Sequence, residues 1–95
     1  MSRPLRIQYP GAYYHVMNRG ISRSSIFHLD HDYKIFLELL KESSTFFKIE
    51  ILAYCLLNNH YHLLVRTPKA NLSRAMRHID SKGVKSLLDH NLDFF

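Results

Sequence analysis

Cysteine is nearly absent from this chain, since Cys55 is the only one in 95 residues. A single cysteine excludes a disulfide within the chain and a metal cluster built on cysteine ligands. Chains of this kind are typical of reducing compartments, so we expect a cytoplasmic location. We expect the Cys55 side chain itself to be a small buried apolar group.

Long apolar runs are missing as well. The longest nearly uncharged apolar segment is Ile51–Leu57, whereas a helix that spans a bilayer needs about 20 such residues. The opening residues, MSRPLRIQYPG, also lack the apolar centre of a signal peptide. The sequence therefore predicts neither a membrane span nor a membrane partner.

Acidic residues are the minority among the charged ones: 13 Lys and Arg stand against 8 Asp and Glu, which gives a net charge of +5. Such a balance suits the phosphate backbone of a nucleic acid or another anionic surface, without choosing between them. Apolar residues make up 46% of the chain and include six Tyr and six Phe, which is enough for a packed core. A chain of this length holds one domain, residues 1–95.

Three segments have the composition of strands. They are residues 12–19 (AYYHVMNR), 48–57 (KIEILAYCLL) and 60–66 (HYHLLVR). Asn58 and Asn59 are expected to join the last two as a tight turn, because Asn tolerates positive φ better than most residues.

Two segments have the apolar spacing of helices. The first covers residues 30–47, and Asp30 or Asp32 is expected to cap its start. The second follows Asn71, its expected N-cap, and the sequence DSKG at 80–83 is expected to break it. A short apolar stripe follows at Val84, Leu87 and Leu88.

The predicted order is strand, helix, strand, strand, helix. A hairpin and a first strand, covered on one face by helices, make an α+β sandwich. We therefore expect a ferredoxin-like antiparallel sheet with helices packed on it, which is the commonest form of this arrangement.

The segment LLNNHYHLLV, residues 56–65, places two histidines in one predicted strand. Because strand side chains alternate with period two, His60, His62 and Arg66 share one face and Tyr61 points to the other. Two histidines at this spacing are more often hydrogen-bonded surface groups than ligands. As ligands they fall short of the three that zinc usually takes. With oxygen donors from elsewhere they suit Mg²⁺ or Mn²⁺ bound together with a substrate phosphate.

This segment resembles the HUH motif (His, bulky hydrophobic, His) of the IS200-like single-tyrosine transposases, and most closely that of their REP-associated branch. Three further segments support the resemblance: YYHVMNRG at 13–20, IFHLDHDYKIFLELL at 26–40 and NLSRAMRHI at 71–79. The resemblance covers roughly residues 3–79, so the chain resembles one HUH domain whose C-terminal part is atypical from about residue 80.

The resemblance implies a mechanism of DNA transposition, the recombination reaction that moves a mobile element. A divalent ion, Mg²⁺ or Mn²⁺, on His60 and His62 polarises a phosphate in single-stranded DNA. A tyrosine from the following helix then attacks that phosphate and forms a covalent intermediate. The resemblance also implies hairpin-tipped DNA as the partner, and a homodimer.

The family pattern is incomplete in this chain. No tyrosine follows Tyr61, which alternation turns away from the metal face, so the nucleophile is not identified. The third metal ligand is not identified either, and Asp80 and His78 are candidate substitutes. The resemblance therefore implies a metal-dependent single-strand DNA transposase or nickase domain that lacks its tyrosine nucleophile, and we expect little strand cleavage from it. The alternative is a catalytically inactive remnant of the family that binds DNA or pairs with an active copy.

Several basic and aromatic residues are candidates for DNA contacts. The phosphate candidates are Arg3, Arg6, Arg19, Arg23, Arg66, Lys69, Arg74 and Arg77, among which Arg66 is best placed because it shares the histidine face. Tyr13 and Tyr14 are candidates for stacking on bases, unless they face the helices. The remaining histidines, His15 among them, show no convergent spacing and are expected to be surface groups. An RNA-recognition sheet is disfavoured, because its Lys/Arg-Gly-aromatic signature strand is absent.

Overall fold

The computed structural model describes residues 8–82 and 93–94. Its elements are β1 (Ala12–Arg19), a 3₁₀ turn η1 (Ile21–Arg23), α1 (Asp30–Phe47), β2 (Glu50–Leu57), β3 (His60–Thr67), α2 (Leu72–Lys82) and β4 (Asp93–Phe94). The expected α+β class and the order of its first five main elements are confirmed. The short strand β4 was not predicted.

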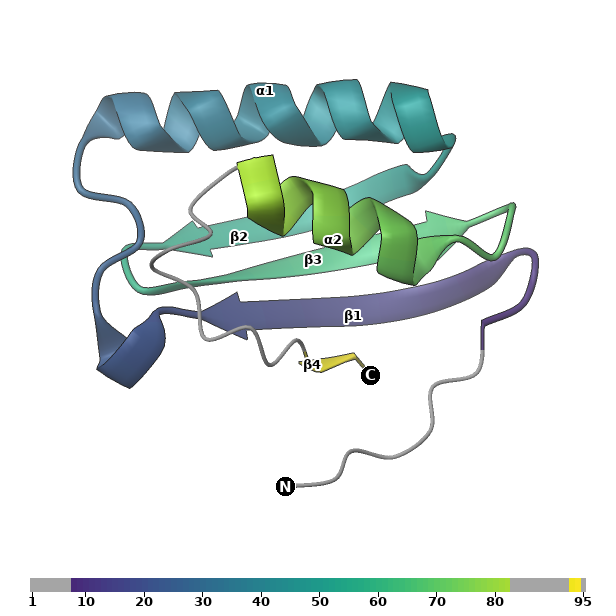
Figure 1. The fold of residues 1–95 in the computed structure, drawn as a ribbon, viewed down its shortest axis with the longest axis horizontal. Helices are drawn as coiled ribbons and strands as arrows, with labels where there is room; N and C mark the ends of the chain where they lie inside the picture. Colours follow the sequence, from purple (N-terminus) through teal and green to yellow (C-terminus); the bar gives the residue numbers. More distant parts are fainter. Residues whose placement is uncertain (1–7, 83–92, 95) are drawn as a thin grey trace.

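The sheet has the strand order β2-β3-β1-β4, and all neighbouring strands are antiparallel. With β4 included, the order β-α-β-β-α-β is that of ferredoxin-like domains. Figure 1 shows both helices on the same side of the sheet. In the described part of the chain the opposite side of the sheet carries no helix.

The core lies between that sheet face and the two helices. Alternate residues of β1 and β3 are buried, as period-two alternation requires. The fully buried apolar side chains of the strands and helices include Val16, Leu63, Val65, Leu72, Met76 and Ile79. Phe36 and Leu40 supply the buried stripe of α1, so the 3.6-residue spacing correctly predicted which side of this helix is covered.

Several boundaries differ from the expectation for local reasons. β2 begins at Glu50 and not at Lys48, because Lys48 adopts a left-handed conformation (φ 56°) that ends α1. The Asn58-Asn59 turn is confirmed, but neither residue has a positive φ. Their carbonyl groups instead accept hydrogen bonds from the amides of residues 20, 26 and 27, so the loop after β1 holds the turn.

Different side-chain hydrogen bonds are made at the starts of the two helices. The N-cap residue of α1 is Leu29, so neither Asp30 nor Asp32 occupies that position. Asp32, in the first turn, instead accepts the backbone amides of His28 (2.8 Å) and Leu29 (2.9 Å) through its carboxylate. These hydrogen bonds lower the pKa of Asp32 below its ordinary value. Asn71 does not cap α2 with its side chain. Its amide donates to the Phe47 carbonyl (2.8 Å) and so joins α2 to the end of α1.

Helix α2 continues through Asp80 to Lys82, so the break expected within DSKG is wrong for residues 80–82, while Gly83 lies outside the described residues. The apolar stripe expected from Val84 to Leu88 lies outside the described residues. Within residues 8–82 and 93–94, neither helix has the length and apolar character needed to cross a membrane.

Candidate nucleic-acid interface

Three strands place a group of functional side chains on the sheet face opposite the helices. Arg19 pairs with His60, and Met17 with His62, in the β1–β3 register. Residues that are directly opposite in an antiparallel pair point to the same side of the sheet. We call this side the histidine face, and its side chains are Tyr13, His15, Met17, Arg19, Glu50, Ala53, Cys55, Leu57, His60, His62, Leu64 and Arg66.

His60 and His62 lie together on this face and are partly buried. Their ring centroids are 5.0 Å apart and their planes are nearly perpendicular, at 81°. The Nδ1 atom of His60 is 2.7 Å from Oδ1 of Asn59. A carbonyl oxygen only accepts hydrogen bonds, so the His60 Nδ1–H donates and the lone pair of this imidazole is on Nε2. A hydrogen bond of this kind fixes the tautomer of a metal-binding histidine.

His15 belongs to the same cluster, although the sequence predicted an isolated surface group. Its Nε2 is 3.0 Å from Nδ1 of His62, and the two rings are stacked, with centroids 5.1 Å apart and planes at 2°. Desolvation, together with the charges of His60 and His15, lowers the pKa of His62. His62 therefore favours the neutral form, which is the form that binds metals.

The cluster fits a divalent ion that takes most of its ligands from elsewhere. Among the residues that the structure describes, no three His, Cys, Asp or Glu side chains are arranged to hold a metal by themselves. A structural zinc site is therefore not formed by these residues. Two imidazoles leave coordination positions for phosphate oxygens and water, as Mg²⁺ and Mn²⁺ sites commonly do.

Cys55 is exposed, not buried as expected, because its side chain is on the helix-free face of the sheet. It lies opposite His62 in the β2–β3 register, so the two side chains point to the same side. It does not complete a three-residue metal group.

A buried polar network lies behind the histidines, on the helix side of the sheet. The Tyr61 hydroxyl donates to Oδ1 of Asp80 (2.6 Å), and the Asn18 amide donates to Oδ2 of the same carboxylate (3.3 Å). Burial, followed by the charge of Asp80, raises the pKa of Tyr61 well above its ordinary value. A buried, protonated phenol on the far side of the sheet cannot attack a phosphate at the histidines. Tyr61 was rejected as the nucleophile because alternation turns it away from the histidines, and its position beneath the sheet agrees with that rejection.

Both candidate third ligands are also away from the histidine face. Asp80 is committed to Tyr61 and Asn18 beneath the sheet. His78 packs between the helices, with its ring centroid 5.3 Å from that of Phe47.

The candidate phosphate-binding arginines are divided between the two sides of the domain. Arg19 and Arg66 lie on the histidine face, but Arg66 is paired with Glu50 (3.0 Å). Arg74 and Arg77 are exposed on α2, in the helix layer and away from the histidines. The predictions for Arg3 and Arg6 concern residues outside the described part of the chain.

The two candidate stacking tyrosines are separated by the alternation of β1. Tyr13 is exposed on the histidine face, where the Arg66 guanidinium lies 5.9 Å from the centre of its ring. Tyr14 is in the core. Only Tyr13 is therefore placed to stack on a base at this face.

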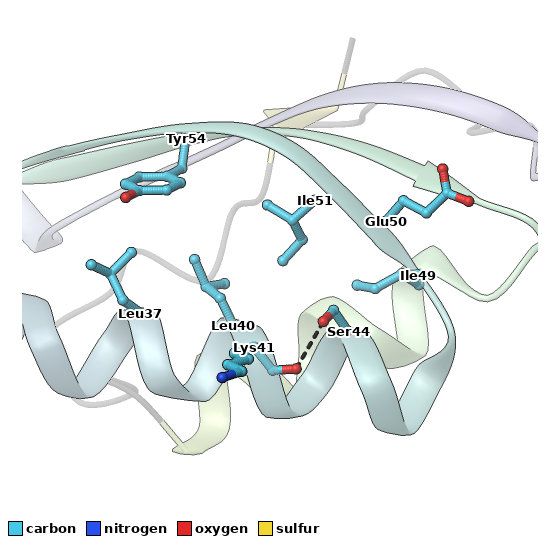
Figure 2. Close-up of a pocket in the computed structure, with 8 residues that line it drawn as sticks. All are labelled: Leu37, Leu40, Lys41, Ser44, Ile49, Glu50, Ile51 and Tyr54. Carbon is cyan, nitrogen blue, oxygen red and sulfur yellow. Dashed lines mark hydrogen bonds between the residues drawn. The ribbon is translucent and has the colours of Figure 1, made fainter.

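A separate pocket of about 350 Å³ lies between α1 and the edge strand β2. Figure 2 shows Leu37, Leu40, Ile51 and Tyr54 around an apolar centre, with Lys41 and Glu50 at its margins. Because this pocket is on the helix side of the sheet, it is not part of the histidine site.

The fold and the site together define a small α+β domain with an imidazole cluster and arginines on the helix-free face of its sheet. Residues 8–93 match the family model described as "Transposase IS200 like". The chain belongs to this family. A comparison with curated protein sequences found no match.

Two solved structures share the fold. One is the REP-associated tyrosine transposase bound to a REP hairpin, with a TM-score of 0.83 and 19% identity over all of this chain and 61% of the other. The second is described as a proposed transposase from Deinococcus radiodurans R1, with a TM-score of 0.72 and 16% identity over all of this chain and 85% of the other. This chain thus spans about three-fifths of the first relative.

Proposed function

We propose that this chain is a metal-dependent DNA-binding domain, which holds a phosphate of single-stranded or hairpin-tipped DNA beside His60 and His62. The observation that carries the proposal is the meeting of these two rings on the helix-free sheet face, 5.0 Å apart. The hairpin-bound relative with the same fold supports hairpin DNA as the class of ligand.

The protein's contribution to this site is orientation. Asn59 fixes the tautomer of His60, and His15 is the hydrogen-bond partner of His62. When His62 donates through Nδ1 to Nε2 of His15, the lone pairs on Nε2 of both His60 and His62 are available for one ion. A bound Mg²⁺ or Mn²⁺ would neutralise charge on the phosphoryl oxygens of the DNA.

The orienting role of His15 is testable by a substitution that keeps an aromatic ring. His15→Phe is expected to weaken Mn²⁺ binding about 10- to 100-fold, as the loss of a residue that hydrogen-bonds to a metal ligand commonly does. Tyr13→Phe, on the same strand and face, is the control and should leave Mn²⁺ affinity unchanged. Isothermal titration calorimetry measures both, and equal affinity for the two variants would contradict the role of His15.

Base and backbone contacts are proposed for the same face. Tyr13 is 63% exposed there and is available for base stacking, a contact worth about 1–3 kcal/mol in single-strand binders. Arg19 and Arg66 are the proposed phosphate contacts of this face, while Arg74, Arg77, Arg3 and Arg6 remain predictions for a longer DNA.

Binding through phosphates is expected to weaken with salt. For two or three contacts, the plot of log affinity against log salt should have a slope of about −1.5 to −2 for a single strand. Fluorescence anisotropy with a labelled hairpin oligonucleotide that has single-stranded thymidine tails, in Mn²⁺, provides the measurement. A slope near zero would show that the DNA backbone is not what the protein binds.

We do not propose that this chain cleaves a DNA strand. The tyrosines of this sequence all precede residue 62, and Tyr61 is fully buried. Incubation of the same oligonucleotide with the protein and Mn²⁺, followed by intact-mass measurement, should show no covalent adduct. An adduct would favour the alternative reading, in which the chain is an active nickase.

A second copy of this chain is the proposed protein partner. The edge strand β2 has no neighbour on its outer side in the described structure, and its Leu52 and Tyr54 side chains are 50% and 57% exposed. Exposed apolar edges of this kind pair with other strands. Sedimentation velocity should show a dimer that Leu52→Lys converts to a monomer.

A further inference from the structure

A pocket of about 210 Å³ lies at the end of the histidine face, next to His60. Its lining residues are Met17, Arg19, Arg23, Asn59 and His60. We infer that this pocket binds a second phosphodiester of the DNA strand, adjacent to the phosphate at the histidine pair. The inference rests on the proposed function and adds to it a subsite and a key residue, Arg23.

The first cation of the pocket is placed by strand pairing. Arg19 is directly opposite His60 in the β1–β3 register, so both side chains leave the sheet on the same side. A phosphate bound beside His60 would therefore have a guanidinium within its reach from the neighbouring strand.

The second cation comes from a strained turn. Arg23 is in η1 and has a left-handed conformation (φ 62°), as does its neighbour Ser22 (φ 51°). Residues other than glycine rarely adopt this conformation, which persists only where the surrounding structure holds it. Strain of this kind concentrates at ligand-binding sites, and here it accompanies an arginine that lines a pocket.

Hydrogen bonds fix this turn to the histidine strand. The Gly20 amide donates to the Asn59 carbonyl (2.9 Å), and the Ile26 amide donates to the Asn58 carbonyl (2.7 Å). A Cβ atom on Gly20 would lie 2.0 Å from the Ser24 carbonyl oxygen, so only glycine allows the loop to close this tightly. Asn59 therefore has two roles: its backbone carbonyl holds the loop after β1, and its side chain orients His60.

The lining chemistry favours a phosphodiester. Guanidinium groups match phosphate oxygens with paired N–H donors. None of the five lining residues is acidic. Met17 adds an apolar wall suited to a sugar or base. The pocket thus combines cationic donors with an apolar surface, as nucleotide sites do.

The position of the pocket suits a strand that crosses the histidines. Tyr13 and Arg19 are six residues apart on β1, which is about 20 Å at ~3.3 Å per residue. A single strand stacked on Tyr13 and passing the histidine pair would reach the pocket at the far end of the face.

A methylphosphonate scan tests the inference. Single phosphates of the thymidine-tailed hairpin oligonucleotide are replaced in turn by neutral methylphosphonates, and affinity is measured by anisotropy in Mn²⁺. The wild type should show two adjacent sensitive phosphates at the His60 end of the face, separate from the contact proposed for Arg66, each losing about tenfold on replacement. Arg23→Gln should bind the unmodified DNA about tenfold more weakly and keep only one of these two, with Mn²⁺ affinity unchanged. Lys34→Gln, on the exposed side of α1, loses the same charge and should keep both.

The outcomes separate this inference from the proposed function. If Arg23→Gln keeps both sensitive phosphates and full affinity, the pocket is not a phosphate subsite, while the histidine site stands. If the wild type binds no oligonucleotide, both are overturned. Circular dichroism verifies that Arg23→Gln is folded. Arg23→Lys keeps the charge but not the paired N–H donors, so its affinity should lie between those of the wild type and Arg23→Gln. A folded Lys variant that binds more weakly than the Gln variant would contradict a phosphate contact.

Discussion

Replacing His60 and His62 together by alanine is expected to lower Mn²⁺ affinity by at least about 100-fold while the α+β fold persists. The loss is expected because the two rings are the proposed protein ligands, and even the loss of a residue that only orients a ligand costs about 10- to 100-fold. The fold should persist because both side chains are on the helix-free face and neither belongs to the core. Electron paramagnetic resonance of free Mn²⁺ measures the affinity, and circular dichroism the fold.

The matched control removes two histidines elsewhere. His28 and His31 are exposed near the start of α1, and their joint replacement by alanine should leave Mn²⁺ affinity unchanged. Equal affinity in the His60/His62 and His28/His31 double variants would contradict the assignment of the ligands. A parallel loss in both would indicate nonspecific binding to histidines.

Asp80→Ala is expected to destabilise the protein by about 2–5 kcal/mol. The substitution leaves the buried Tyr61 hydroxyl and Asn18 amide without their partner, and each such group costs about 1–3 kcal/mol. Asp80→Asn retains one acceptor and should cost less. Urea denaturation measures both. A cost below about 1 kcal/mol for the Ala variant would show that this network does not join α2 to the sheet.

The same network predicts a loss of stability in alkali. In the unfolded chain Tyr61 ionises near its ordinary pKa of about 10, whereas in the folded protein its pKa is raised well above that value. The folded state therefore keeps the proton that the unfolded state releases, so this contribution is complete below pH 10 and declines as the pH rises above it. Tyr61→Phe should lower stability at neutral pH and flatten this decline. Parallel stability curves for the two proteins would contradict the raised pKa.

Local periodicity explains what the sequence could predict. The period of two in β3 placed His60 and His62 on one face and Tyr61 on the other, and the structure has this arrangement. The period of 3.6 predicted α1 at Asp30–Phe47 with the observed boundaries. Both patterns depend on neighbouring residues alone, so no knowledge of the tertiary structure was needed.

The remaining features depend on pairing between distant segments. The contact of His15 with His62 requires the β1–β3 register, which joins residues 47 positions apart. Cys55 was expected in the core because its segment is apolar, but its pairing with His62 places it on the face that no helix covers. Arg23 enters a pocket only because its turn is fixed to the Asn58-Asn59 turn. His15 and Arg19 are four residues apart in one strand, so period-two alternation predicts that both side chains are on the same face. The sequence alone could therefore have predicted this feature.

The claim that the histidine pair holds a metal beside DNA is tested most directly by electron–nuclear double resonance of Mn²⁺ in the complex. The protein carries ¹⁵N-labelled histidine, and the thymidine-tailed hairpin oligonucleotide supplies the phosphorus. Our account predicts that one bound Mn²⁺ couples both to histidine ¹⁵N and to ³¹P, and that the nitrogen coupling disappears in the His60/His62 double variant. Phosphorus coupling with no histidine nitrogen would mean that the ion is bound by the DNA alone, and would contradict the account.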